Sequence, residues 1–269
     1  DTGDMKVTLT DYGTGAWSSG GNLPLARDSH AGLGSQTAAG VVGGRTSPPA
    51  TTSVNSFLTY DGSSWTEAPN INQQRWLGEA SGTLTSGILY TGAHPASNNL
   101  IDNVETYDGS SWTEVSEVNT GRRSLGGAGT TSTAALAYAG RDGTNHYALS
   151  ESWNGSSWTE VADLNTARAY STGSGTTTAA LYVGGHDNTT SRSLTETYDG
   201  TSWTELGDLN TARHSLANTG SPTAALAMAG RVAPPLPSSG NKAIAESFNG
   251  TSWTEVADLS TARMDHNCA

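Results

Sequence analysis

The sequence predicts an all-β protein folded as a propeller, in which four-stranded antiparallel blades are arranged radially around a central channel. A sixteen-residue phrase occurs five times with little change, as in YDGTSWTELGDLNTAR from Tyr198 to Arg213. Six tryptophans repeat every 45–50 residues, which is the length of one four-stranded blade. No long window has the 3.6-residue apolar period of an amphipathic helix. The marker tryptophans are Trp17, Trp65, Trp112, Trp158, Trp203 and Trp253.

The unit that follows Arg168 shows the four strands in order, from the channel to the rim. AYSTGSG is small and polar, as an inner strand beside a crowded axis should be, and TTTAALYVGG contains an apolar run from Ala179 to Val183. After the loop HDNTTSRS, the third strand LTETYDG ends in Asp199-Gly200. This pair predicts a two-residue type I′ hairpin, because both residues tolerate positive φ. SWTEL is the rim strand, and its tryptophan is expected to pack between adjacent blades, where full burial contributes about 2–3 kcal/mol.

The whole chain, 1–269, is predicted to form a single propeller domain. Before the five units, KVTLTDYGTGAWSSGGNL resembles a third and a rim strand, and after them ARMDHNCA resembles the start of an inner strand. We therefore expect six blades, the sixth shared between the N- and C-termini, and no segment clearly supplies its second strand. A three-stranded closing blade, a truncated chain or a strand from another subunit are the open explanations, and a ring of five blades with appended end strands is the alternative. The units are 27–74, 75–121, 122–167, 168–212 and 213–262, with the closing blade formed by 1–26 and 263–269.

The charge of the chain excludes several classes of partner. The formal net charge is −12, and only Lys6 and Lys242 are lysines. A nucleic-acid groove needs a basic surface, and an anionic membrane repels an acidic one, so we expect no nucleic-acid partner and no membrane insertion. No apolar run approaches the roughly 20 residues of a membrane span. Cys268 is the only cysteine, which excludes an internal disulfide.

The order of glycine, tyrosine, tryptophan and arginine within each unit resembles the kelch repeat. In that pattern a Gly pair closes the second strand, a Tyr lies in the third, a Trp follows about five residues later, and an Arg opens the next unit. The Gly pair is intact at Gly43-Gly44 and Gly184-Gly185, whereas Gly92, Gly140 and Gly230 stand alone. The phrase DGTSWTE…LNTAR…GTTTAAL is also similar to the kelch-like repeats in structural and fibre proteins of marine tailed bacteriophages.

The recurring arginine is the main candidate for ligand binding. Strand direction places it at the start of the innermost strand, around one mouth of the channel. In kelch domains that bind acidic peptides, arginines at this position line the pocket, so the resemblance implies a site for a carboxylate, a phosphate or an acidic sugar. The alternative is a structural arginine bound to backbone carbonyls or to the third-strand glutamate of a neighbouring blade. The arginines are Arg27, Arg75, Arg122, Arg168, Arg213 and Arg263; the glutamates are Glu105, Glu151, Glu196 and Glu246.

The same mouth is expected to carry the longest loops and the variable residue after each arginine. Trp76 departs most from the repeat at that position and could stack on a sugar ring or pack in the interior. The variable residues are Asp28, Trp76, Arg123, Ala169, His214 and Met264. The loops are Arg45–Ser53, Ala93–Asn103, Arg141–Ala148, His186–Ser193 and Arg231–Lys242.

The motifs of common catalytic sites are missing from the sequence. The six histidines show no zinc-ligand spacing, and there is neither a nucleophile elbow nor a phosphate loop. A copper radical oxidase, the enzymatic relative of kelch propellers, needs a Cys-linked Tyr, which the single Cys268 does not provide. We expect no enzyme activity and no cofactor, and structural calcium stays open as an addition.

Together these features predict a non-catalytic virion or extracellular surface protein that serves in structural attachment and recognises its partner through the loop face. Other protein subunits are the expected partners, with viral capsid or tail proteins first and a host-surface glycan second. A kelch-type adaptor or glycan-binding module is the alternative. A glycoside hydrolase is the weaker alternative, because 25 Asp and Glu residues are present without a distinctive pair.

Overall fold

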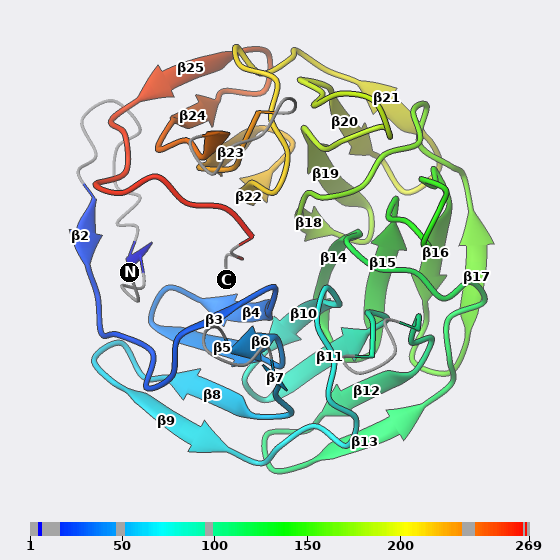
Figure 1. Ribbon diagram of the computed structural model, residues 1–269. Coiled ribbons are helices and arrows are strands. Elements are labelled where there is room, and N and C mark those ends of the chain that lie inside the picture. The colour runs from blue at the N-terminus through cyan, green and yellow to red at the C-terminus, as the bar shows by residue number, and fades with distance from the viewer. Residues whose placement is uncertain are drawn as a thin grey trace.

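The computed structural model describes residues 5–6, 17–46, 52–94, 99–232, 240–265 and 267, and it contains five four-stranded antiparallel blades around a central channel (Figure 1). The predicted all-β propeller is confirmed, and the described residues contain no α-helix. From inner to rim strand, the blades are β4 (Ala31–Ser35), β5 (Ala38–Val42), β8 (Phe57–Tyr60), β9 (Trp65–Ala68); β10 (Glu79–Thr83), β11 (Ser86–Tyr90), β12 (Val104–Tyr107), β13 (Trp112–Val115); β14 (Gly126–Thr131), β15 (Ala134–Tyr138), β16 (Ser150–Trp153), β17 (Trp158–Val161); β18 (Gly173–Thr176), β19 (Ala179–Val183), β20 (Thr195–Tyr198), β21 (Trp203–Glu205); and β22 (Ala217–Ser221), β23 (Ala224–Met228), β24 (Ala245–Phe248), β25 (Trp253–Val256).

The turn between the third and rim strands differs from the prediction. Tyr198 pairs with Trp203, so the loop has four residues, 199–202, and the predicted two-residue type I′ turn is wrong. The Asp199 carboxylate explains the longer loop, because its Oδ1 accepts the backbone N–H groups of Thr201 and Ser202 at 2.8 Å each. This Asx arrangement supplies the hydrogen bonds that a tighter turn would otherwise provide.

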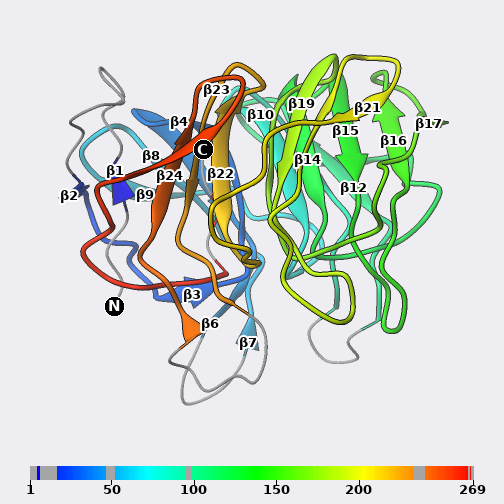
Figure 2. The same cartoon turned by 90° about the horizontal axis from the view of Figure 1, so that it is seen from above.

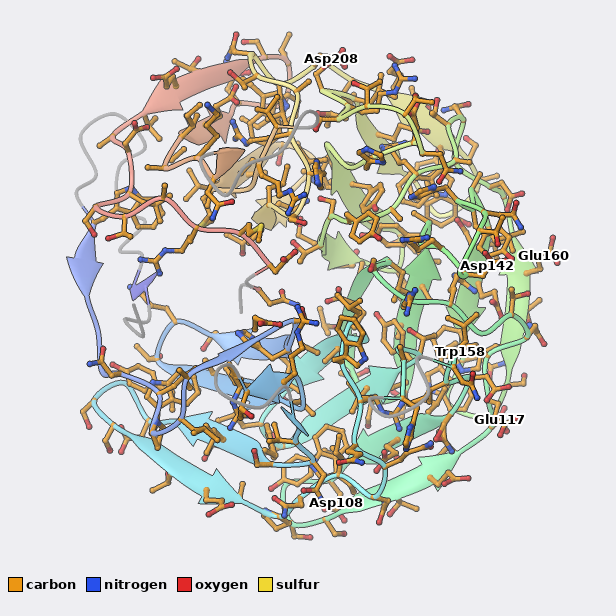
Figure 3. The ribbon with its side chains drawn as sticks, in the orientation of Figure 1. Asp108, Glu117, Asp142, Trp158, Glu160 and Asp208 are labelled. Atoms are coloured by element: carbon orange, nitrogen blue, oxygen red, sulfur yellow. The ribbon has the colours of Figure 1, made fainter. Side chains whose placement is uncertain are left out.

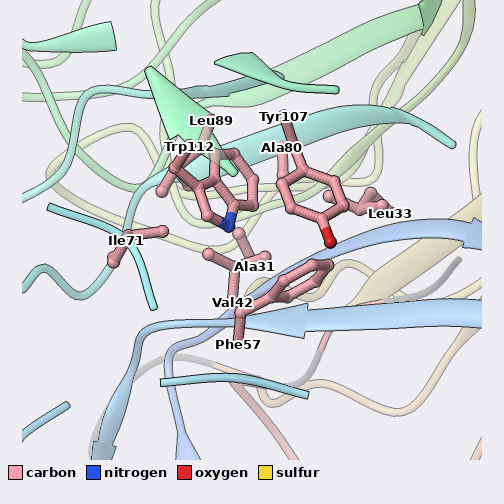
Figure 4. Close-up of a cluster of buried hydrophobic side chains, with 9 residues drawn as sticks. All are labelled: Ala31, Leu33, Val42, Phe57, Ile71, Ala80, Leu89, Tyr107 and Trp112. Carbon is pink, nitrogen blue, oxygen red and sulfur yellow. The ribbon is translucent and has the colours of Figure 1, made fainter. Parts of the chain in front are cut away.

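Clusters of apolar side chains hold adjacent blades together. Figure 4 shows the cluster between the first two blades, where the ring of Phe57 meets Tyr107 and Trp112 edge-on at centroid distances of 5.0 and 5.3 Å. Four rim tryptophans are only 5–7% exposed, and Trp65 and Trp17 are half-buried. The four are Trp112, Trp158, Trp203 and Trp253. Each of the four thus belongs to the apolar layer that joins neighbouring blades.

Small residues let the inner strands approach one another closely at the axis. A Cβ on Gly173 would lie 2.1 Å from the Tyr138 hydroxyl and 2.3 Å from the Gly127 backbone. We expect Gly173→Ala to lower the free energy of unfolding by about 1–3 kcal/mol, because two blades would have to separate. Urea denaturation measures this change. Gly143→Ala is the matched control, since a Cβ there meets nothing within 4 Å, and equal effects of the two substitutions would contradict the prediction.

The first two strands of the chain lie beside the last blade, at a sixth position in the ring. Here β1 (Met5–Lys6) pairs antiparallel with β2 (Ser18–Ser19), and Trp17 donates its indole N–H to the Ala257 carbonyl at 2.6 Å. Figure 1 shows this pair between β25 and β9. The five complete blades match the five-bladed alternative, whereas the sixth position holds only two paired strands among the described residues. Of the expected closing segments, 1–4, 7–16, 266 and 268–269 lie outside the described residues.

A circle of backbone hydrogen bonds closes the channel mouth with sixfold symmetry. In each unit the residue two positions after the recurring arginine has a φ of 52–62°. Its backbone N–H donates to the backbone carbonyl of the equivalent residue in the preceding unit. Asp265, near the C-terminus, completes the circle. Its backbone carbonyl accepts the N–H of Ser29, and its own N–H donates to the Ser215 carbonyl. The six residues are Ser29, Leu77, Ser124, Tyr170, Ser215 and Asp265. Both chain ends therefore contribute to a ring of six positions.

Candidate functional site

Four of the six recurring arginines are buried inside their blades. Their side chains are 0–1% exposed, and both terminal nitrogens of each guanidinium are hydrogen-bonded. The paired glutamate belongs to the same repeat unit, not to a neighbouring blade. The pairs are Arg75–Glu105, Arg122–Glu151, Arg168–Glu196 and Arg213–Glu246. In this conformation these guanidiniums stabilise the blades and are not accessible from the mouth.

The buried glutamate also links its blade to the preceding one. Asn119, in the preceding unit, donates its backbone N–H and its side-chain amide to Glu151 Oε2 at 2.7 and 2.8 Å. Arg122 donates to the other oxygen at 2.5 Å and to the Ala137 carbonyl at 3.0 Å. The same asparagine contact recurs at three more interfaces. The LNTAR phrase thus recurs because its Asn and its Arg hold one carboxylate from two sides.

The first and last arginines have different surroundings. Leu58 occupies the position of the glutamate in the first blade, and Arg27 instead donates to the Gly43 carbonyl at 3.1 Å and to Ser56 Oγ at 2.9 Å. Arg263 donates to the Thr261 carbonyl at 3.4 Å. Both side chains are half-buried, so these two ring members lie nearer the solvent than the other four.

A second set of cationic and aromatic side chains surrounds the same mouth. Figure 2 shows β3 (Arg27–Asp28), β6 (Arg45–Thr46) and β7 (Thr52–Ser53) on one face of the propeller, and backbone bridges join Arg45, Arg141, His186 and Arg231 to the residues that follow the recurring arginines. Seven of the nine side chains directly follow either the recurring arginine or the glycine that ends the second strand, whereas Tyr170 lies two positions after Arg168 and His146 lies further along the loop that begins at Arg141. We call this set the loop-face site; its members are Arg45, Trp76, Arg123, Arg141, His146, Tyr170, His186, His214 and Arg231.

Trp76 is the aromatic centre of one half of the loop-face site. The Arg45 guanidinium lies 4.5 Å from the centre of the indole ring, and that of Arg123 lies 5.9 Å from it. Arg45 also forms an ion pair with Asp28 at 2.6 Å. The indole is half-buried, which leaves part of it accessible. The sequence alone left both stacking and packing open for Trp76, and the structure places the guanidiniums of Arg45 and Arg123 over its ring.

Arg123 and Arg141 bring two positive charges together beside Tyr170. Their backbones form an antiparallel bridge with reciprocal N–H···O bonds of 2.9 Å, so the two side chains are directly opposite. Burial and the Arg141 charge lower the pKa of Arg123. Arg141 lies over the Tyr170 ring at 5.3 Å and donates to its hydroxyl. Like charges in cross-strand positions are destabilising, and a bound anion relieves that repulsion.

Three histidines complete the other half of the site around Tyr170. Their ring centroids lie 6.0, 6.4 and 6.1 Å from that of Tyr170 for His146, His186 and His214. Burial, followed by the Arg141 charge, lowers the pKa of His146. Burial, then His186 and Arg231, lower the pKa of His214 to about 4. These imidazoles are therefore neutral at pH 7, and the arginines carry the positive charge of the site.

A small cavity of about 60 Å³ lies at the circle of hydrogen bonds, with room for a few water molecules. Its lining includes Ser124, Tyr170, Asp265, Glu79 and Asn267. Burial raises the pKa of Glu79 to about 8, although a hydrogen bond from Asn267 opposes the shift. The channel therefore contains a carboxyl group that is largely protonated at neutral pH.

The loop cations and histidines were missed in the sequence, although a short signal points to them. A basic residue or a histidine follows the glycine that ends the second strand in four of the five complete blades. The pairs are Gly44-Arg45, Gly140-Arg141, Gly185-His186 and Gly230-Arg231. Each of these residues is bridged to the variable residue after the recurring arginine, which brings the two sequence positions together at the mouth.

Comparison with known proteins assigns no family to the chain. No protein-family model matches it, and no curated protein matches it. Within the described ranges, no group of three or more histidine, cysteine or acidic residues has the geometry to hold a metal ion. The described part of the chain likewise contains no helix long and apolar enough to cross a bilayer.

Proposed function

We propose that this propeller is a non-catalytic recognition and attachment module of a virion or extracellular surface, and that it binds an acidic glycan through the loop-face site. The observation that carries the proposal is the gathering of arginines and aromatic rings at one mouth of a chain with a net charge of −12. The virion setting, with capsid or tail subunits as neighbours, rests on the similarity of the repeat wording to phage structural proteins.

The distribution of charge supports binding at the mouth. The rim strands carry an exposed glutamate in every complete blade, and Figure 3 shows Glu160 and Glu117 pointing outward at the rim. An anion is repelled by that rim and attracted to the arginines at the mouth, so its approach is directed to one face. The rim glutamates are Glu67, Glu114, Glu160, Glu205 and Glu255.

The mixture of groups favours an acidic sugar over a simple anion. Guanidinium groups form charge-assisted hydrogen bonds with carboxylates and sulfates. Trp76 and Tyr170 lie beside arginines and are half-buried, so the accessible part of each ring offers apolar surface against which the C–H face of a sugar ring can pack. Arginines and aromatic rings lie side by side at the mouth. An acidic glycan likewise combines carboxylate or sulfate groups with sugar rings.

Arg141→Ala is expected to weaken binding of polygalacturonate or dextran sulfate about tenfold or more, because it removes a charge-assisted contact worth about 1.5–3 kcal/mol. Trp76→Ala is expected to weaken it similarly. Glu160→Gln on the rim is the control and should change affinity by less than about threefold. Surface plasmon resonance at fixed ionic strength gives the affinities, with neutral dextran as the reference. Binding of neutral dextran as tight as that of dextran sulfate, or hydrolysis of polygalacturonate, would contradict the proposal.

A further inference from the structure

The arrangement of the histidines suggests a property of the loop-face site that goes beyond anion binding and rests on the proposed function. We infer that an anion bound at this site is bound together with protons, which His214 and its neighbours His186 and His146 take up. Affinity for the anion should therefore rise as the pH falls from about 7.5 to about 5.5.

The three imidazoles form one cluster. The rings of His186 and His214 are 5.1 Å apart with an interplanar angle of 66°, and those of His146 and His186 are 5.9 Å apart. His214 is buried, with 6% of its surface exposed, whereas His146 and His186 are half-buried. The cluster thus extends from solvent into the mouth, beside the arginines that would hold the anion.

Burial and the charges on neighbouring elements together set the protonation of the cluster. His146 faces Arg141, His186 and Asp187, and Asn188 lies beside it. His186 faces Asp187 and three arginines, which are Arg141, Arg231 and Arg192. His214 faces His186 and Arg231. The Asp187 carboxylate is itself bound to Arg192, so its negative charge is partly neutralised. Burial first, and then the surrounding cations, keep the rings neutral until a negative charge arrives.

The hydrogen bonds of the rings identify which histidine accepts a proton with the least rearrangement. His186 Nδ1 accepts the backbone N–H of Asn188 at 3.2 Å, and protonation of that nitrogen would break the bond. His214 Nδ1 lies 2.8 Å from the Ser191 hydroxyl, which can donate to a neutral ring or accept from a charged one. Of these two rings, His214 is therefore the one that can take up a proton without losing a hydrogen bond.

Linkage fixes the sign and the size of the effect. An anion beside an imidazole favours the charged form and raises its pKa, so the complex binds more protons than the free protein below about pH 6.5. For each pKa unit by which the bound anion raises the pKa of one histidine, affinity can rise up to tenfold. The rise takes place between the pKa of that histidine in the complex and its pKa in the free protein. Because the pKa of His214 is about 4 in the free protein, a tenfold gain in affinity between pH 7.5 and pH 5.5 corresponds to an anion that raises this pKa to about 6.5.

The experiment measures dextran sulfate binding between pH 5.5 and 7.5 at constant ionic strength, because the sulfates stay ionised throughout this range. Calorimetry of the wild-type protein at pH 5.5, in two buffers of different ionisation enthalpy, counts the protons taken up on binding. We expect net uptake, an affinity gain of about tenfold at pH 5.5, and a flatter pH profile in His214→Gln. The rim variant Glu160→Gln controls for general changes in protein charge and should keep the wild-type profile.

The outcomes separate this inference from the proposed function. Binding that is independent of pH and takes up no protons would overturn the inference and leave anion recognition intact. A wild-type pH profile in a folded His214→Gln variant would overturn the assignment to His214. Failure to bind dextran sulfate and polygalacturonate at any pH would overturn the proposed function itself.

Discussion

Glu151→Ala is expected to lower the free energy of unfolding by about 3–5 kcal/mol, because it leaves a buried guanidinium without its counter-charge. Glu151 is 2% exposed and Arg122 is 0% exposed. The substitution removes the 2.5 Å contact to Arg122 and both hydrogen bonds from Asn119, which come from the preceding unit. Water cannot replace these partners without entering the interface between two blades. Chemical denaturation followed by tryptophan fluorescence measures the loss.

Glu160→Gln is the matched control for this prediction. Glu160 pairs directly with Glu151 across β16 and β17, but its side chain is exposed at the rim. Its substitution should change the free energy of unfolding by less than about 0.5 kcal/mol. A loss below about 1 kcal/mol for Glu151→Ala would contradict the role assigned to the buried pair.

The first blade suggests a further test of the same pair. There Leu58 occupies the glutamate position, and Arg27 is satisfied by carbonyl and hydroxyl oxygens. An apolar side chain is therefore tolerated when the arginine has other partners. The double variant Arg122→Met/Glu151→Leu should be less destabilised than Glu151→Ala alone, because it leaves no unpaired charge.

Glu79→Gln is expected to stabilise the protein by about 3–5 kcal/mol at pH 8 and to have little effect at pH 4.5. Burial raises the pKa of Glu79 from 4.5 to about 8. Between these values the folded state binds a proton that the unfolded state has released, so stability falls as the pH rises. Glutamine has the shape of the protonated acid and does not ionise, which removes this loss. Urea denaturation at several pH values measures the difference.

The control for this second prediction is Glu117→Gln at the exposed rim, which should leave the pH dependence unchanged. Two histidines have the opposite effect on the pH dependence of stability, because burial lowers the pKa of both His30 and His214 to about 4. They reduce stability as the pH falls from 6.5 towards 4, where the unfolded state binds protons that the folded state does not. A stabilisation by Glu79→Gln that is equal at pH 4.5 and pH 8 would contradict the assignment.

The sequence predicted the blade well because the relevant information lies within one repeat. Alternating and apolar runs placed the four strands, and the spacing of tryptophans placed the units. The sequence-based prediction of a two-residue turn after Tyr198 was wrong, because the Asp199 side chain binds two backbone N–H groups in a loop of four residues. The sequence-based prediction also paired arginine and glutamate across blades, whereas Arg122 meets Glu151 within one blade.

By itself, the sequence determined the fold class, the order of strands in each blade and the position of the recurring arginine at the start of a unit. Only the tertiary structure decided that four of those arginines are buried while Arg45, Arg141 and Arg231, from three different loops, gather at the mouth with three histidines. The physical reason is that strand patterns are set by neighbours a few residues apart, whereas the mouth depends on ring closure. That closure joins units roughly 45 residues apart through single hydrogen bonds, the last of them between Ser29 and Asp265.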